Sequence, residues 1–164
     1  MIDIGFTGTR QGCTAAQLRT LGAIFQRMAA GGSPDGSVEP FNHRTIRGHH
    51  GDCEGADAEF HTLVLAFGGD VVLHPPLVRD LRAECRHAVE ERPPKKFLAR
   101  DHDIADESVW VIACPKEMEE PKQKRGGGTW ATVRYSAGEL GKKPPGGARK
   151  VIVILPDGSE VRRS

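Results

Sequence analysis

The chain has 164 residues and a mass of 17.8 kDa; 38% of its residues are hydrophobic and 27% are charged, with 23 Lys and Arg against 22 Asp and Glu. This composition is typical of a globular domain with a buried core, and no apolar stretch approaches the roughly 20 residues that span a bilayer. The near-neutral charge argues against a dedicated duplex-DNA-binding protein, which usually carries a strong basic excess.

The N-terminus has no basic start followed by an apolar stretch and a cleavage site, so we expect a cytoplasmic protein without membrane association. The four cysteines are widely separated and form no CxxC pair: Cys13, Cys53, Cys85 and Cys114. This spacing predicts reduced thiols rather than a disulfide framework or a structural zinc site.

The first half of the chain predicts a strand over residues 2–8, a helix over 14–30 and a loop over 31–43. A weaker strand (44–50) and a second helix (55–67) follow. Thr14 and Gln17 fit a capping box at the start of the first helix. The apolar residues of that helix fall on one predicted face: Leu18, Leu21, Phe25 and Met28.

The second half predicts a strand over residues 70–76, closed by two prolines, and two helices over residues 79–91 and 96–108. A buried strand (109–115), a polar loop (117–128), a helix (129–140) and a last strand (150–156) follow, before a polar tail. Such alternation favours an α/β fold: a mainly parallel sheet with helices on both faces. We see no repeat and no boundary, and therefore predict a single domain over residues 1–164.

Polar and glycine-rich loops follow four of the predicted strands. In an open parallel sheet, ligands bind beyond the carboxyl ends of the strands, where such loops meet. The four segments are residues 6–12 (FTGTRQG), 48–58 (GHHGDCEGADA), 74–76 (HPP, with His74 and Pro75 as candidate ligand-binding residues) and 125–130 (RGGGTW).

The segment RGGGTW combines glycines with a helix start. Gly127 and Gly128 would let the main chain approach a ligand closely, and the helix would aim its positive end at an anion. Thr129 would cap the helix or donate its hydroxyl to a phosphate, and Arg134 would face the same pocket one turn later. The alternative is a flexible joint with an ordinary threonine cap.

The turn after the first strand has the same character. Gly8 and Thr9 would offer backbone and hydroxyl donors, and Arg10 would offer a two-pronged guanidinium group. An ordinary surface turn is the alternative.

Three acids lie at the mouth of the second predicted helix, beside Gly51 and Gly55: Asp52, Glu54 and Asp57. Helix capping explains acids at this position, and so does recognition of ribose hydroxyls by carboxylates. Both interpretations stay open.

His49 and His50 stand next to Asp52 and Cys53, which raises the question of a metal site. Adjacent side chains of a strand point to opposite faces, so one ion could not easily bind both histidines. We therefore predict no metal, and no cofactor. Cys13 has no identifiable partner that would make it a nucleophile.

Trp130 and Arg100 each allow two interpretations. Trp130 would stack on a base or pack in the core. Arg100 lies one helical turn from Asp103 and would form a surface ion pair or reach a ligand phosphate; we favour the ligand.

The order of these segments, from the Gly-Thr-Arg turn through GHHGDCEGADA, HPP and ARDHDIAD to GGGTWATVRYS, resembles the SLOG superfamily. That group unites DNA-processing-A-like proteins, Lonely Guy phosphoribohydrolases and short uncharacterised bacterial and phage members. The resemblance runs from about residue 4 to residue 155. It implies a Rossmann-like fold, a pocket for a nucleotide-derived ligand with phosphate near residues 8–10 and 127–129, and homo-oligomers.

The chain departs from the phosphoribohydrolase pattern, Pro-Gly-Gly-x-Gly-Thr-x-x-Glu. Gly128 and Thr129 match its second Gly-Thr, but Thr132 stands where the family has its catalytic glutamate, and residues 124–126 replace Pro-Gly-Gly. The resemblance therefore favours binding of a nucleotide, such as an ADP-ribose-related signal, over its turnover.

Two alternatives stay open. The chain would be a hydrolase of a nucleotide N-glycosidic bond if Asp52, Glu54 or Asp57 supplied the missing carboxylate. Binding of single-stranded nucleic acid is less favoured, because one Tyr and two Trp offer few stacking surfaces.

Overall fold

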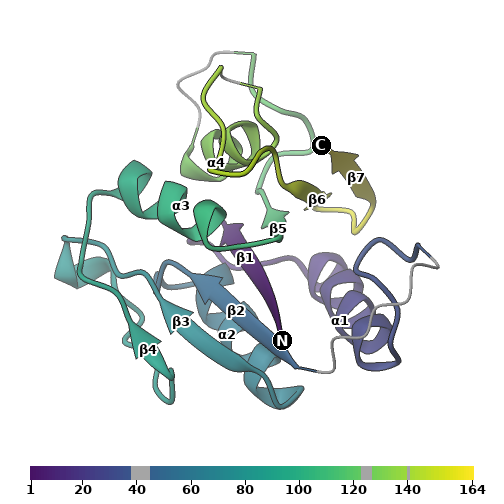
Figure 1. Ribbon diagram of the computed structural model, residues 1–164, viewed down its shortest axis with the longest axis horizontal. Coiled ribbons are helices and arrows are strands. Elements are labelled where there is room, and N and C mark those ends of the chain that lie inside the picture. The colour runs from purple at the N-terminus through teal and green to yellow at the C-terminus, as the bar shows by residue number, and fades with distance from the viewer. Residues whose placement is uncertain (38–44, 123–126, 140) are drawn as a thin grey trace.

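The computed structural model describes residues 1–37, 45–122, 127–139 and 141–164. Its described strands form one seven-stranded sheet in the order β4-β3-β2-β1-β5-β6-β7 (Figure 1). The strands are β1 Ile2–Gly8, β2 Ile46–His50, β3 Asp70–Leu73, β4 Glu90–Glu91, β5 Trp110–Cys114, β6 Lys150–Ile154 and β7 Glu160–Arg163. All neighbours pair in parallel except β6 and β7. The predicted α/β class and mainly parallel sheet are confirmed.

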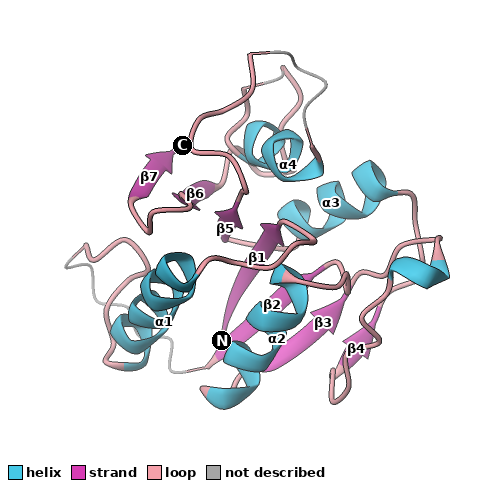
Figure 2. Cartoon of the chain, turned by 180° about the vertical axis from the view of Figure 1, so that it is seen from behind, coloured by secondary structure: helices cyan, strands magenta, loops and turns pink. Residues whose placement is uncertain are grey.

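Helices cover both faces of the sheet, as predicted (Figures 1 and 2). The helices are α1 Ala15–Ala29, α2 Ala56–Ala66, α3 Phe97–Asp106 and α4 Gly128–Ser136, with a short 3-10 turn η1 at Arg79–Leu81. Helix α2 packs on β1, β2 and β3, while α3 and α4 pack against each other on the opposite face. None of the helices in the described ranges is both long and apolar enough to cross a membrane.

The larger part of the core lies between the sheet and helices α1 and α2. The Phe6 and Phe60 rings stack with centroids 4.4 Å apart, and Phe25 meets Phe60 edge-on at 5.9 Å. A second cluster around Val111, Val133 and Val153 fills the space under α4. Burial on both faces explains why β5 and β6 are continuous apolar runs.

The capping box of α1 is confirmed. The Gln17 N–H donates to Thr14 Oγ1 (3.0 Å), and the Thr14 N–H donates to Gln17 Oε1 (2.9 Å). The Gln17 amide also donates to the carbonyls of Pro115 and Ile154, each at 2.8 Å, and so fixes α1 against the ends of β5 and β6. The predicted apolar face was wrong at Leu18, which is exposed.

The helix predicted over residues 79–91 was wrong. Only η1 is helical there, and the following residues wrap around Asp52 before the chain enters β4. The Asp52 carboxylate accepts hydrogen bonds from Arg82 Nε (2.7 Å) and the Cys85 N–H (2.9 Å). Glu84 and His87 take positive φ angles, which a helix does not allow. Tertiary hydrogen bonds have therefore overridden the helical tendency of this segment.

The polar tail also differs from its prediction, because residues 160–163 form β7. This strand pairs antiparallel with β6 through a tight turn at residues 155–159, with Val161 opposite Val153. In the predicted loop over residues 31–43, residues 31–37 contain no helix or strand, and 38–43 lie outside the described residues.

Candidate functional site

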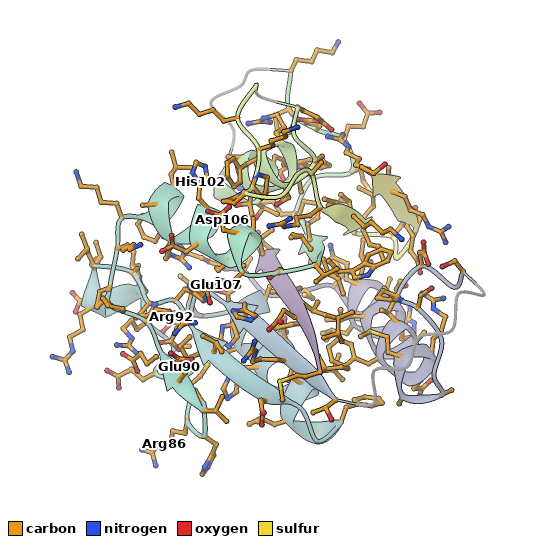
Figure 3. All side chains as sticks on the ribbon, in the orientation of Figure 1. Arg86, Glu90, Arg92, His102, Asp106 and Glu107 are labelled. Atoms are coloured by element: carbon orange, nitrogen blue, oxygen red, sulfur yellow. The ribbon has the colours of Figure 1, made fainter. Side chains whose placement is uncertain are left out.

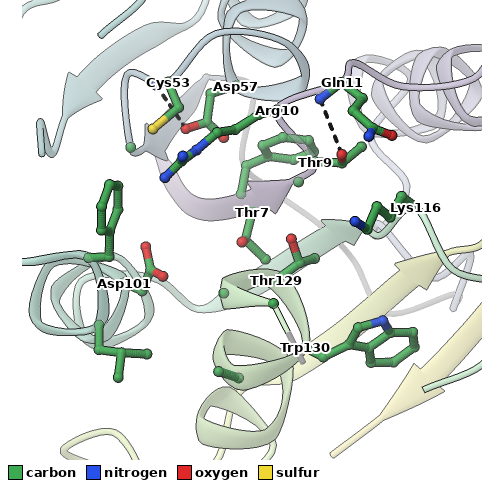
Figure 4. Close-up of a pocket in the computed structure, with 18 of the residues that line it drawn as sticks. Thr7, Thr9, Arg10, Gln11, Cys53, Asp57, Asp101, Lys116, Thr129 and Trp130 are labelled. Atoms are coloured by element: carbon green, nitrogen blue, oxygen red, sulfur yellow. Dashed lines mark hydrogen bonds between the residues drawn. The ribbon is translucent and has the colours of Figure 1, made fainter. Parts of the chain in front are cut away.

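A cavity of about 680 Å³ opens at the carboxyl end of β1, between the starts of α2, α3 and α4 (Figure 4). Its volume falls within the range of small-molecule sites. Ten predicted ligand-binding residues line it: Gly8, Thr9, Arg10, Gly51, Asp57, Arg100, Gly127, Gly128, Thr129 and Trp130.

The turn after β1 forms one wall, and main-chain hydrogen bonds hold it in place. The Thr9 N–H donates to the Cys114 carbonyl (3.2 Å), and the Thr9 carbonyl accepts from the Ala56 N–H (3.1 Å). A Cβ on Gly8 would lie 2.5 Å from Ala56 Cβ, and one on Gly55 would lie 2.3 Å from the Arg10 carbonyl oxygen. These glycines allow the β1 turn to contact the start of α2.

Arg100 is the buried cation of the cavity. Its guanidinium group crosses Gly51 so closely that a Cβ there would lie 1.3 Å from Arg100 Nη1. Its hydrogen bonds are long: Nη1 donates to the His74 carbonyl at 3.4 Å and Nη2 to Cys53 Sγ at 3.3 Å. Arg100 Nε is buried and has no hydrogen-bond partner among the described residues. A ligand that accepts hydrogen bonds would satisfy this group, which is costly to leave unpaired.

The surface ion pair considered for Arg100 does not form. Asp103 instead accepts a hydrogen bond from Lys95 Nζ at 2.5 Å. Arg100 lines the cavity, and its contact with a ligand phosphate stays a prediction.

Two buried carboxyl groups share the cavity with Arg100. Burial raises the pKa of Asp57 to about 7, although Arg100 and the Cys53 N–H (3.1 Å) favour its charged form. Burial also raises the pKa of Asp101, against the opposing effects of Arg100 and the Thr132 hydroxyl. The raised pKa of Asp57 reduces its negative charge at neutral pH, beside the positive charge of Arg100.

The start of α4 forms the opposite wall. Gly127 is the N-cap residue, with φ +32°, and no side chain of the described residues caps this helix end. Thr129 lies inside the first turn, so its predicted capping role was wrong, while its position on the cavity leaves a phosphate contact open. Backbone N–H groups of a first helical turn lack partners within the helix and can bind an anion. Arg125 and Gly126 lie outside the described residues.

Six predicted residues do not line the cavity: Asp52, Glu54, Gly55, His74, Pro75 and Arg134. Glu54 is exposed, and Asp52 holds residues 82–85. Arg134 donates to Glu120 Oε1 at 2.7 Å, one helical turn beyond Trp130, and does not line the cavity.

Trp130 lies at the edge of the cavity, with its indole ring to one side of Arg10 and Asp57 (Figure 4). Only 3% of the residue is exposed, its Nε1 donates to Glu117 Oε2 (3.2 Å), and Arg163 lies 5.4 Å from the ring centre. These contacts match the core-packing interpretation rather than stacking on a base.

The sequence interpretation missed several lining residues, above all Phe97, Asp101 and Lys116. Two guanidinium groups lie near the Phe97 ring, that of Arg10 at 4.7 Å and that of Arg100 at 5.2 Å from its centre. Lys116 follows β5 almost directly, so the expectation that ligands bind beyond the carboxyl ends of the strands could have identified it. Asp101 carried no signal except its place beside Arg100.

Comparison with solved structures finds a similar fold in the X-ray structure of DNA processing protein A (DprA) from Streptococcus pneumoniae, with a TM-score of 0.58 and 17% sequence identity. The match covers 93% of this chain and 50% of that chain, so this chain spans about half the length of DprA. The similarity shows a shared Rossmann-like α/β fold. No family model and no curated protein matches the sequence.

Proposed function

We propose that the cavity binds a nucleotide or nucleotide-derived ligand of the ADP-ribose type. The observation that carries this proposal is the meeting of Arg10 and Arg100, both close to the Phe97 ring, with the start of α4, which no side chain of the described residues caps. Cations and a helix N-terminus suit phosphates, and an aromatic ring beside them suits a base.

In this arrangement the phosphates lie between Arg100 and the backbone of Gly128 and Thr129. Asp101 accepts hydrogen bonds from ribose hydroxyls, as carboxylates do in dinucleotide-binding folds, while Asp57 interacts with Arg100. Phe97 offers its half-buried ring to the base, in place of Trp130. The Rossmann-like fold supports this proposal, since such sheets bind ligands where the strand order reverses, which here is between β1 and β5.

Titration calorimetry with ADP-ribose, NAD and nucleoside monophosphates tests the proposal. Arg100→Lys keeps the charge but removes the planar guanidinium group, and we expect it to weaken binding about tenfold or more. Arg134→Lys is the matched control, because Arg134 is also buried but lies outside the cavity. Equal affinity of both variants for every ligand would contradict the proposed site.

A second candidate function is hydrolysis of a nucleotide N-glycosidic bond. The observation that favours it is Asp101, whose carboxyl group faces Gly128 and interacts with Thr132, the residue at the position of the family's glutamate. Asp57 and Asp101 would then act as general acid and base, since a pKa near neutrality suits that task.

Replacement of each acid by its amide separates the two functions. If the protein is a hydrolase, Asp101→Asn should reduce turnover by two orders of magnitude or more while the ligand still binds. A binding protein would show no release of free base from any variant, and Asp57→Asn and Asp101→Asn would change only affinity.

A further inference from the structure

Two histidine-containing clusters lie on opposite faces of β2, outside the cavity. His50 meets His61 and Cys85, and His49 meets His74 and Glu107; in each cluster the candidate donor atoms lie within 4.8 Å of one another. The prediction that His49 and His50 point to opposite faces is confirmed. Tertiary structure has supplied each of them with other partners.

The His50 cluster is explained by hydrogen bonds alone. His50 Nδ1 accepts from the Asp52 N–H (3.1 Å), so Nε2 carries the proton and donates to His61 Nδ1 (2.9 Å). His61 Nε2 then donates to the Arg86 carbonyl (2.7 Å). One set of neutral tautomers satisfies every ring nitrogen, and burial raises the pKa of the Cys85 thiol to about 12, which keeps it protonated.

The His49 cluster has different chemistry. Asp3 Oδ1 lies 2.9 Å from His49 Nε2, so this nitrogen carries the proton and Nδ1 presents a lone pair. That lone pair points at His74 Nε2 (3.1 Å) and lies 3.7 Å from Glu107 Oε2. Ligands at about 2.0–2.1 Å in a tetrahedral zinc site are roughly 3.3 Å apart, close to both separations.

We propose that His49 Nδ1, His74 Nε2 and Glu107 Oε2 bind one divalent transition-metal ion of the Zn²⁺ class. Two imidazoles and a carboxylate suit such ions, and Asp3 completes the carboxylate–histidine pair that orients metal-binding histidines. Both histidines are almost fully buried, but the Glu107 side chain is 32% exposed, which gives an ion a route from solvent. Figure 3 shows Glu107 at the end of α3, beside Arg92 and Glu90.

The ion would join the sheet to the helix that carries Arg100 and Asp101. Asp3 belongs to β1, His49 to β2, His74 follows β3, and Glu107 ends α3. Arg92 shares Glu107: its Nη2 donates to Oε2 at 2.6 Å, and its Nε lies 3.2 Å from both carboxylate oxygens. Its positive charge lowers the affinity of the site, and an ion bound to Oε2 shares that oxygen with Arg92.

Titration of the chelator-treated full chain with Co²⁺ and Zn²⁺ tests the proposal. We expect one ion per chain, visible absorption bands of Co²⁺ in a low-coordinate nitrogen and oxygen site, and no thiolate-to-cobalt charge-transfer band. A charge-transfer band would assign the ion to the cluster with Cys85 and overturn the proposal. Absence of binding at micromolar Zn²⁺ would also overturn it, leaving His49 and His74 as a neutral hydrogen-bonded pair.

Three variants locate the ion. Glu107→Gln should weaken Zn²⁺ binding at least about tenfold, and Asp3→Asn about 10–100-fold. Glu90→Gln is the matched control, since Glu90 also contacts Arg92 but is not a ligand, and it should bind Zn²⁺ within about twofold of wild type. Circular dichroism verifies that each variant is folded. Unchanged affinity in folded Glu107→Gln would contradict the site.

Discussion

Gly51 and Arg100 depend on each other at the scale of single residues. The guanidinium group occupies the volume that any side chain at Gly51 would need, since Nη1 would be 1.3 Å from the new Cβ. The backbone of Gly51 does not have a positive φ angle, so steric contact with Arg100 is the reason for glycine at this position. The packing of Arg100, and not the backbone conformation, therefore requires glycine at position 51.

Gly51→Ala should therefore displace Arg100 and weaken ligand binding by an amount similar to Arg100→Ala, while the protein stays folded. Gly22→Ala is the control, because a Cβ there, within α1, has no atom within 4 Å. We expect Gly22→Ala to raise the free energy of unfolding by roughly 0.5–1 kcal/mol. Calorimetry and urea unfolding measure both effects, and wild-type affinity in Gly51→Ala would refute the dependence.

The raised pKa of Asp57 predicts that the stability of the protein depends on pH. Its folded pKa is about 7, whereas an unfolded aspartate has a pKa of about 3.9. Between these values the folded state holds a proton that the unfolded state has lost, so stability falls as pH rises from about 4 to 7. The loss has an upper limit of roughly 4 kcal/mol.

Urea unfolding of wild type and Asp57→Asn across this range isolates the effect, since other titrating groups cancel in the difference. We expect the stability of wild type relative to Asp57→Asn to decrease steadily with pH. Asp80→Asn, at an exposed position, should follow the wild-type curve. A difference that does not change with pH would show that Asp57 titrates normally.

Protonation of Asp57 should also strengthen anion binding. The neutral form removes a negative charge from the cavity, so the affinity for a ligand whose own charge is constant should decrease as pH rises through about 7. NAD is a suitable probe, because its diphosphate does not titrate in this range. Calorimetry at several pH values should show this decrease in wild type, and an affinity independent of pH in Asp57→Asn.

At the scale of elements, residues 79–91 show how one buried acid determines the path of a segment. Asp52 itself has a positive φ angle of 52°, and its carboxylate holds Arg82 and the Cys85 N–H. The Asp52 carbonyl accepts from the Ala83 N–H as well (2.8 Å). These contacts assign Asp52 a structural role.

Asp52→Ala should cost about 2–4 kcal/mol of unfolding free energy, because it leaves the partly buried Cys85 N–H and Arg82 without the Asp52 carboxylate as their acceptor. Cleavage by trypsin within residues 79–92 should also become faster, while ligand binding by the remaining folded protein stays close to wild type. Glu54→Ala, at the exposed neighbouring acid, should change stability by less than about 0.5 kcal/mol. A large loss of affinity in folded Asp52→Ala would instead place Asp52 in the binding site.

The elements that sequence could predict are those determined by local chemistry. The capping box at Thr14, the apolar runs of β5 and β6 and the glycine-bounded α2 all formed as expected. The segment at 79–91 and strand β7 could not be predicted, because contacts with Asp52 and with the β6 edge determine them. The prediction that Arg134 faces the cavity was wrong for a related reason. A tertiary contact holds its side chain, which donates to Glu120 instead.

At the scale of the whole molecule, strand order decides which loops meet. The chain runs from β1 outward through β2 and β3 to β4, then returns to β5 on the other side of β1. The loops after β1 and β5 therefore border the cavity directly, together with Gly51 and Asp57 after β2. His74 and Pro75 follow β3, two strands from β1, and do not reach it. Sequence alone located the correct sheet edge but could not give this order.

The same strand order explains why Phe97 and Asp101 line the cavity. Helix α3 leads into β5, which pairs with β1, so the end of α3 packs over Gly5 of β1 and its start lines the cavity. No motif in the sequence indicates that position. Homo-oligomerisation stays a prediction at this scale, and light scattering after size-exclusion chromatography measures it: a mass of 17.8 kDa would contradict it.

The central claim is that this cavity retains an intact nucleotide-like ligand, and a retention-and-integrity measurement tests it most directly. Stoichiometric protein is mixed with nucleoside monophosphates, NAD, ADP-ribose and cyclic nucleotides, filtered and denatured, and both fractions are separated by chromatography. We predict that at least one compound stays with wild type, is recovered intact, and passes through the filter with Arg100→Lys. Release of free base over time would instead identify a hydrolase, and retention of no compound would contradict the assignment of the cavity.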